Sequence, residues 1–256
     1  MSLRFCSLGS GSEGNALIVE VNGRAVMLDC GFGIAETERR LARADLGPEH
    51  LDAILVTHEH SDHLGGVARF ARKHRLPVWT TSGTRQFVDE AILSTDFLRA
   101  IDPHQSFAIG AIQVTPYAVP HDAAEPVQFV FSDGSSRLGV MTDTGTLTAH
   151  IEEHLSGCDA LVLECNHDLD MLMNGPYPER LKKRVGGKFG HLDNHTAASL
   201  LTNIDCTHLR HIIAAHLSKT NNRPELAQQA LADALHCDPA WIGVAGQETG
   251  FGWREV

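Results

Sequence analysis

The sequence lacks the features that place a chain in a membrane or in an oxidising compartment. Its longest hydrophobic runs, such as residues 54–56 and 160–163, fall well short of the about 20 residues that a transmembrane helix needs. No long apolar segment follows the first residues, so we expect no signal peptide. The six cysteines contain no C-x-x-C pair, which predicts free thiols in a reducing compartment. We therefore expect a cytoplasmic protein with no membrane partner.

The chain also lacks an excess of positive charge. With 21 Lys and Arg against 32 Asp and Glu, its formal net charge is −11. This balance argues against a surface that is basic all round, although it leaves room for a local basic patch. Low-complexity segments, internal repeats and linkers are missing too, so we predict one domain over residues 1–256. The unusual count is sixteen histidines.

Short β-type runs alternate with helical segments along the chain. The pattern predicts strands at 3–8, 16–21, 25–28, 52–57, 77–80, 112–119, 127–131, 137–142, 160–164 and 211–215. It predicts helices at 34–44, 64–74, 146–155, 196–204 and 224–236. Asn22-Gly23 is a strong hairpin signal between the second and third strands. The interleaving is typical of an α/β sandwich with sheets inside and helices outside.

Residues 58–63 read HEHSDH and place four candidate metal ligands in six positions, directly after a buried strand. Histidine and aspartate are costly to bury without partners, so such a cluster is either solvated or held by a metal. In an extended segment His58 and His60 project to the same side. Asp62 and His63 then lie at the start of the next helix, where they can face a second ion. The motif therefore predicts a metal site.

Three further candidate ligands follow other strands. His121, Asp143 and His216 each come just past a predicted strand, and loops on a rigid scaffold are a common place for metal ligands. With His121 and His216 as third ligands and Asp143 between two ions, each ion has enough donors and keeps an open position, as catalysis requires. Imidazole and carboxylate suit Zn²⁺ or Mn²⁺, and also iron.

With these residues, the sequence resembles the metallo-β-lactamase superfamily, whose signature is H-x-H-x-D-H followed by separated His, Asp and His. The resemblance implies a four-layer αβ/βα sandwich with a dinuclear site at its edge. Six segments further resemble the YycJ/WalJ-type branch, which is related to ribonuclease Z and is nuclease-like, with DNA exonuclease activity implied. These segments are SLGSGSEGN at 7–15, VPHDAAEPV at 119–127, ECNHDLDML at 164–172, GPYPERLKKRV at 175–185, GHLDNHTAA at 190–198 and HLSKTNNRPELA at 216–227.

The resemblance also implies how the ligands are shared between two divalent ions. The first ion would be held by His58, His60 and His121, the second by Asp62, His63 and His216, with Asp143 bridging. A hydroxide held between the two ions would attack phosphorus, since a bound metal lowers the pKa of water towards about 7. Asp62 would in addition orient this nucleophile.

The proton donor for the leaving oxygen is less well defined. In ribonuclease Z a Glu and a His are thought to shuttle this proton, and their positions resemble Glu164 and His191. The residues that follow each of them differ from the ribonuclease Z pattern, so His195 or His167 are alternatives. His191 can equally have a structural role at the start of a helix that Asp193 or Asn194 would cap.

Two segments are candidates for binding the substrate. The run RLKKRVGGK contains Arg180, Lys182, Lys183, Arg184 and Lys188 without an acid, and reads as either a phosphate track or a solvated helix face. Ser218, Lys219 and Asn221, just past His216, are placed either to contact phosphate oxygens or to lead into a plain helix start. The GSGSEGN loop lacks a P-loop pattern, and is either a tight turn or a substrate contact.

Three functions fit these observations. The metal ligands, the basic run and the branch resemblance favour a dinuclear phosphodiesterase acting on nucleic acid, most of all a DNA exonuclease. The acidic net charge and moderate length fit a hydrolase of small cyclic phosphodiesters, thioesters or lactones on the same site. A non-catalytic metal-binding regulatory partner fits least, because the ligand set is complete. The sequence does not indicate the oligomeric state.

Overall fold

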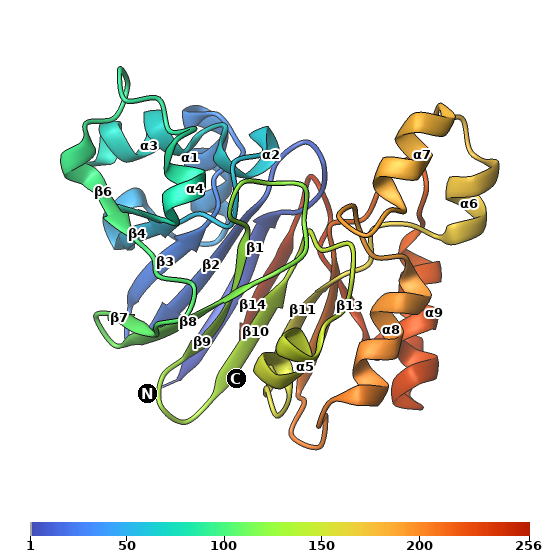
Figure 1. Cartoon of the computed structure of the whole chain (residues 1–256). Helices are drawn as coiled ribbons and strands as arrows, with labels where there is room; N and C mark the ends of the chain where they lie inside the picture. Colours follow the sequence, from blue (N-terminus) through green and yellow to red (C-terminus); the bar gives the residue numbers. More distant parts are fainter. Residues whose placement is uncertain (1) are drawn as a thin grey trace.

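Two seven-stranded sheets stack face to face in the computed structural model, which describes residues 2–256 (Figure 1). The first sheet has the strand order β14 (Phe251–Glu255), β1 (Leu3–Gly9), β2 (Ala16–Val21), β3 (Arg24–Leu28), β4 (Leu51–Leu55), β5 (Val78–Thr80) and β6 (Leu98–Ala100). The second has the order β13 (Gly243–Val244), β12 (His211–Ala215), β11 (Ala160–Glu164), β10 (Arg137–Met141), β9 (Val127–Ser132), β8 (Ile112–Ala118) and β7 (Phe107–Ile109).

Each sheet is antiparallel at one side and parallel at the other. Strands β1 to β3 pair antiparallel, whereas β3 to β6 run parallel. In the second sheet β7 to β10 pair antiparallel and β10 to β13 run parallel. The predicted Asn22-Gly23 turn is confirmed, and both residues have positive φ (57° and 77°), as a tight two-residue hairpin requires.

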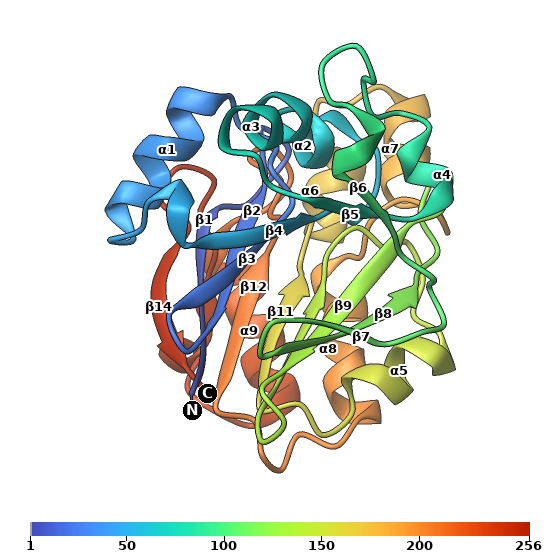
Figure 2. The ribbon, with the colours of Figure 1, turned by 90° about the vertical axis from the view of Figure 1, so that its left-hand side faces the viewer.

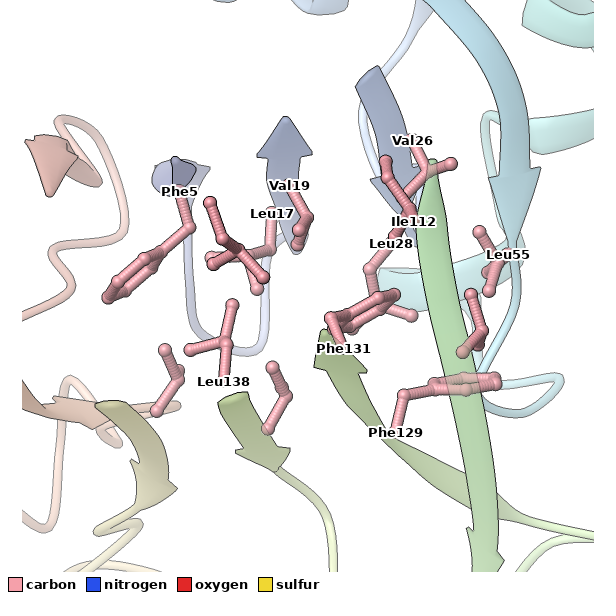
Figure 3. Close-up of a cluster of buried hydrophobic side chains, with 14 of the residues drawn as sticks. Phe5, Leu17, Val19, Val26, Leu28, Leu55, Ile112, Phe129, Phe131 and Leu138 are labelled. Atoms are coloured by element: carbon pink, nitrogen blue, oxygen red, sulfur yellow. The ribbon is translucent and has the colours of Figure 1, made fainter. Parts of the chain in front are cut away.

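Apolar side chains from the inner faces of both sheets form the central core (Figure 3). Phe5 and Leu17 come from the first sheet and meet Phe129, Phe131 and Leu138 of the second. In each strand these residues alternate with side chains that point to the outer face of the sheet. The inner faces of the two sheets therefore share one core.

Helices cover the outer face of each sheet. The α-helices are α1 (Ile34–Arg43), α2 (Ser61–Leu64), α3 (Val67–His74), α4 (Ser82–Arg85), α5 (Ala149–Leu155), α6 (Leu169–Asn174), α7 (Glu179–Val185), α8 (Asn194–Asn203) and α9 (Pro224–Leu235). Short 3₁₀ helices are η1 (Pro48–His50), η2 (Thr95–Phe97) and η3 (Pro239–Trp241). A second core joins α1 and α3 to the first sheet, and a third joins α5, α8 and α9 to the second. The predicted four-layer αβ/βα sandwich is confirmed.

Several elements differ from the sequence prediction. Strand β14 pairs with β1, so the two termini lie side by side (Figure 2), and Val256 N–H donates to Leu3 O at 2.9 Å. Neither β14 nor α6 was predicted, because their apolar periodicity is weak, whereas α7 matches the solvated helix face that was one interpretation of the basic run. The helix predicted at 64–74 is divided into α2 and α3 at Gly65 and Gly66. Within residues 2–256, we find no helix with the length and hydropathy that crossing a bilayer demands.

Candidate metal centre

The predicted ligands lie at one end of the sandwich, where strands from both sheets finish. His58 follows β4, His121 follows β8, Asp143 follows β10 and His216 follows β12. Figure 1 shows α2, α3 and α4 at this end over the first sheet, and α6 and α7 at the same end over the second. The fold therefore brings together side chains that are far apart in the sequence.

The seven candidate ligands form two triads that share a central carboxylate. His58, His60 and His121 have ring nitrogens within 4.8 Å of one another, and so do the ligand atoms of Asp62, His63 and His216. Asp143 forms a further group of this kind with His58 from the first triad and His63 from the second. Asp143 therefore lies between the two triads, as expected for a bridging ligand.

Short distances join the groups within this cluster. His121 Nε2 is 3.2 Å from His60 Nδ1. His216 Nε2 lies 3.3 Å from Asp62 Oδ2 and 3.5 Å from Asp143 Oδ1. Asp143 Oδ2 lies 3.2 Å from His63 Nε2 but has no partner in acceptable hydrogen-bond geometry.

The outer nitrogen of each histidine is occupied by another group. His121 Nδ1 donates to Gly190 O at 3.0 Å, and His60 Nε2 donates to Asp122 O at 3.2 Å. His63 Nδ1 donates to the buried Asp29 carboxylate at 2.8 Å. The other ring nitrogen of each of these side chains therefore faces the cluster, where it can bind a metal ion once it has lost its proton. Such outer partners fix the tautomer and orientation of metal-binding histidines.

Two buried atoms test whether the site fits metal ions. His58 Nε2 and Asp143 Oδ2 are fully buried, yet neither makes a hydrogen bond within residues 2–256. Buried polar atoms of this kind are costly unless something binds them, and both point into the ligand cluster. An imidazole and carboxylate donor set suits divalent zinc, manganese or iron. The residues fit divalent metal ions.

The electrostatics of the cluster keep its carboxylates ionised. Burial opposes ionisation of Asp143, but the positive charges of His216 and His63 outweigh it and hold the Asp143 pKa well below its ordinary value. Burial likewise opposes ionisation of Asp62, and hydrogen bonds from His216 and His63 lower its pKa. Burial of the His58 ring, together with the charge of His63, lowers the His58 pKa, which favours the neutral ring. Anionic carboxylates and a neutral imidazole are the forms that bind metals.

The backbone at the site is held in unusual conformations. Asp29, Asp143 and His216 all have positive φ, at 61°, 54° and 55°. Such left-handed conformations are uncommon outside glycine and often mark functional positions. At His216 the turn is stabilised from both sides, since its N–H donates to Ser10 Oγ at 2.9 Å and its carbonyl accepts from Asn166 Nδ2 at 3.0 Å.

The glycine-rich loop at 9–15 supports the metal ligands. The backbone N–H of Asn15 donates to Asp62 O at 2.8 Å, and its side-chain amide lies 3.3 Å from Asp62 Oδ2. Gly31 packs directly on the backbone of Asp62, because a Cβ added to Gly31 would lie 1.9 Å from Asp62 O. Of the two interpretations, the structure favours a turn with a positioning role, although Ser12 of this loop also lines the cavity at the site.

The two residues predicted to shuttle a proton are in contact. His191 Nδ1 lies 2.7 Å from Glu164 Oε1, and Glu164 Oε2 accepts from the N–H groups of Thr144 (3.0 Å) and Leu192 (3.2 Å). Glu164 is fully buried, whereas the His191 side chain is 20% exposed. Burial opposes protonation of His191, but the Glu164 charge overcomes it and raises the His191 pKa. Conversely, His191 helps to lower the Glu164 pKa to about 2 against its burial.

The alternative histidines lie elsewhere. His195 is exposed on α8, and its N–H donates to Asp193, which caps that helix. His167 is buried, with Nδ1 3.3 Å from Asn166 Oδ1. Neither lines the cavity at the metal centre, whereas His191 does. Asp193, one of the two caps proposed from the sequence, is the observed one.

A cavity of about 310 Å³ opens beside the ligands. Ser12, Asp62, Tyr177, Arg184, His191 and Ser218 are among the residues that line it. Tyr177 was not predicted as a site residue, because nothing in its local pattern distinguishes it from an ordinary loop residue. Ser12 belongs to the GSGSEGN loop, for which a substrate contact was one of the two interpretations. The predicted substrate contacts Arg184 and Ser218 are present at this cavity.

The other predicted substrate contacts lie away from the cavity. Lys182 Nζ donates to Met173 O at 2.7 Å, which joins α7 to α6, and Lys183 is exposed on α7. Lys219 pairs with Glu13 at 2.6 Å. Asn221 is fully buried, and its side-chain amide makes no hydrogen bond within residues 2–256. The structure does not bring these four side chains to the cavity wall.

Comparison with known proteins identifies the family. A family defined as the "Beta-lactamase superfamily domain" matches residues 24–216, and the chain belongs to this metallo-β-lactamase superfamily. The expected resemblance is thereby confirmed. The chain is 36% identical to the exodeoxyribonuclease YycJ of Bacillus anthracis, over 100% of this chain and 94% of that protein. It is 31% identical to the exodeoxyribonuclease WalJ of Streptococcus pneumoniae, over 95% of this chain and 92% of that one.

The fold is also similar to solved structures of low sequence identity. The metallo-β-lactamase fold protein YhfI of Bacillus subtilis aligns over 100% of both chains with a TM-score of 0.76 and 16% identity. This similarity extends the fold assignment to every layer of the sandwich.

Proposed function

We propose that this chain is a metal-dependent exodeoxyribonuclease that hydrolyses phosphodiester bonds with two divalent ions. The observation that carries the proposal is the pair of ligand triads joined by Asp143, beside a cavity that also contains His191 and Arg184. The similarity to YycJ and WalJ over nearly the whole chain favours DNA as the substrate. The six free cysteines are consistent with the predicted cytoplasmic location.

We propose that the ligands divide between two ions as the family resemblance implies, which is supported by the two ligand triads. His58, His60 and His121 would hold one ion and Asp62, His63 and His216 the other, with Asp143 bridging. Bound Zn²⁺ or Mn²⁺ would supply a water-derived nucleophile at neutral pH and neutralise charge on the phosphate. Asp62 reaches into the cavity with an 18% exposed side chain, so its carboxylate can also orient the attacking oxygen.

The remaining residues of the cavity bind the phosphate and move a proton. Arg184 presents a guanidinium to the phosphate, and in the free protein Asp122 holds this group at 2.6 Å. His191, protonated under the influence of Glu164, would donate a proton to the leaving oxygen through Nε2. Glu164 keeps the ring in this orientation through Nδ1.

The direct test is incubation of metal-loaded protein with end-labelled single- and double-stranded DNA and RNA. Release of nucleotides from DNA ends, abolished by chelation and by Asp143→Ala, is the expected result. Cleavage should fall steeply with rising salt, because phosphate contacts release counterions from the nucleic acid. Hydrolysis of a small chromogenic phosphodiester without any cleavage of DNA would refute the nuclease assignment.

A further inference from the structure

A second cavity lies next to the cavity at the metal ligands, and it contains none of the predicted ligands. Its volume is about 200 Å³. It lies between α2–α3 and the segment that follows α4, and is lined by Leu64, Ala68, Arg69, Phe87, Asp89 and Ile92, among others. Figure 1 shows these helices together at the metal end of the sandwich.

Ser61 connects the two cavities. It lies between the ligands His60 and Asp62, starts α2, and lines both spaces. Gly65, one turn further, also lines the second cavity and leaves its wall open for lack of a side chain. A polymer whose scissile phosphate lies at the metal centre therefore has a route over Ser61 into the second cavity.

The second cavity differs chemically from the first. Its walls carry mostly apolar side chains, with the acids Glu59 and Asp89 beside the single guanidinium of Arg69. Phe87 is 56% exposed, and among the aromatic side chains of residues 2–256 it shares this exposure with only Phe189 and Trp241. An exposed aromatic face with apolar neighbours suits a flat nucleobase, because every base can stack on it.

The aromatic side chain stands on a rigid support. Phe87 N–H donates to Thr84 O at 3.0 Å, which continues the turn of α4. Thr81 caps α4 and also donates through Oγ1 to Glu125 O at 2.9 Å, while Gly83 N–H donates to the Glu125 carboxylate at 2.7 Å. The segment that follows β5 and the segment that precedes β9 thus hold α4, and with it Phe87, in place. This lowers the entropy cost of binding a base.

Arg69 provides a charge at the same cavity. Its side chain is exposed, lines the cavity and forms no ion pair within residues 2–256. A guanidinium so placed can bind the phosphate that connects the stacked nucleotide to its neighbour.

We infer that this second cavity is a nucleobase subsite, in which Phe87 stacks on a base of the strand next to the scissile phosphate. The inference rests on the proposed nuclease function and deepens it. It assigns to Phe87 a role in binding single-stranded polymer, with none in the chemical step. Because stacking does not depend on base identity, the subsite should favour a base over no base without selecting a sequence.

The test combines a protein change with a substrate change. Cleavage of a single-stranded oligodeoxynucleotide is measured for the metal-loaded wild type and for Phe87→Ala, with an abasic residue placed at each position from the labelled end in turn. In the wild type, the abasic residue at one position should lower kcat/KM about tenfold, mainly through KM. Phe87→Ala should show a similar loss on the intact oligonucleotide and no further loss at that abasic position. Phe87→Tyr should restore activity.

Two controls make the result specific. Trp241→Ala removes another exposed aromatic side chain (43%) that lines neither cavity and should leave cleavage unchanged. Hydrolysis of a small chromogenic phosphodiester should be equal in the wild type and Phe87→Ala, because that substrate does not reach the subsite. Equal loss on both substrates would instead overturn the subsite, since Phe87 would then support the metal centre.

The remaining outcomes separate this inference from the function on which it rests. If the wild type degrades DNA and Phe87→Ala degrades it equally well, the subsite is refuted and the nuclease function stands. If abasic residues still cost the same in Phe87→Ala, the base binds elsewhere and the subsite is again refuted. If the wild type hydrolyses only the small phosphodiester, the nuclease function fails, and the subsite fails with it.

Discussion

His63 Nδ1 lies 2.8 Å from the Asp29 carboxylate, and both side chains are almost completely buried. Asp29 also accepts from the N–H of Thr57 at 2.9 Å and from its hydroxyl at 2.9 Å. The carboxylate thus joins the end of β3 to the segment that follows β4 and leaves His63 Nε2 directed at Asp62 and Asp143. The tautomer and orientation of the His63 ring at the metal site are therefore fixed by a residue outside the H-x-H-x-D-H motif.

Replacing Asp29 with Asn should weaken metal binding without unfolding the protein. The amide can keep one acceptor for Thr57, but it no longer offers an anion to His63, so the ring becomes a poorer ligand. Loss of such outer partners typically lowers metal affinity by about 10- to 100-fold. Competition with a chelating dye measures this change. An unchanged affinity would show that Asp29 has only a structural role.

The pH dependence of turnover should report the Glu164–His191 pair. Burial lowers the His191 pKa, but the Glu164 charge outweighs it and raises the pKa, which favours the protonated ring. If His191 is the proton donor, kcat falls as pH rises through that pKa. Glu164→Gln removes the charge and lowers the pKa, so this basic limb should move to lower pH. His195→Ala, which changes an exposed histidine on α8, should leave the profile as it is.

The basic residues of α7 should not contribute equally. Arg184 lines the cavity, whereas Lys182 is bound to Met173 O. Arg184→Gln should therefore reduce DNA cleavage and lower the slope of log(kcat/KM) against log[salt] by about 1, the value for one lost phosphate contact. Hydrolysis of a small phosphodiester and metal content should not change. Lys183→Gln serves as the matched control, and equal effects of both changes would argue against a specific contact at Arg184.

Core packing between the sheets should dominate stability. Phe129 is fully buried among side chains of both sheets (Figure 3). Phe129→Ala removes this contact area and leaves a cavity, which typically costs about 3–5 kcal/mol in the free energy of unfolding. Urea unfolding at a fixed metal concentration measures the loss. The exposed Phe87→Ala should cost less than about 0.5 kcal/mol in the same assay.

Much of the fold and the ligand set could be predicted from the sequence, because both leave strong local patterns. Apolar runs bounded by turn residues mark β1, β4 and β11, and the H-x-H-x-D-H motif places four ligands in six positions. The separated ligands His121, Asp143 and His216 follow strands that end at the same side of the sandwich. A strand end is visible in a sequence even where the partner strand is not.

Contacts between distant segments could not be predicted in this way. Asp29, Ser10 and Asn15 support ligands through tertiary contacts, and they look like ordinary turn residues in the sequence. Asn221 was predicted to contact substrate because it follows His216, yet the chain turns there and buries its side chain. Lys182 and Lys219 are close to predicted site residues in the sequence. In the fold, however, Lys182 binds Met173 O and Lys219 pairs with Glu13. Proximity in the sequence was a poor guide to which side chains face the cavity.

The measurement that tests the central claim most directly is the number of metal ions bound per chain. Purified protein is saturated with Zn²⁺ or Mn²⁺, freed of excess, and analysed by elemental mass spectrometry in parallel with Asp143→Ala. We expect two ions per chain in the wild type, and about one in the variant together with loss of turnover. A wild type that holds fewer than two ions, or an Asp143→Ala variant that still holds two, would contradict a dinuclear centre bridged by Asp143.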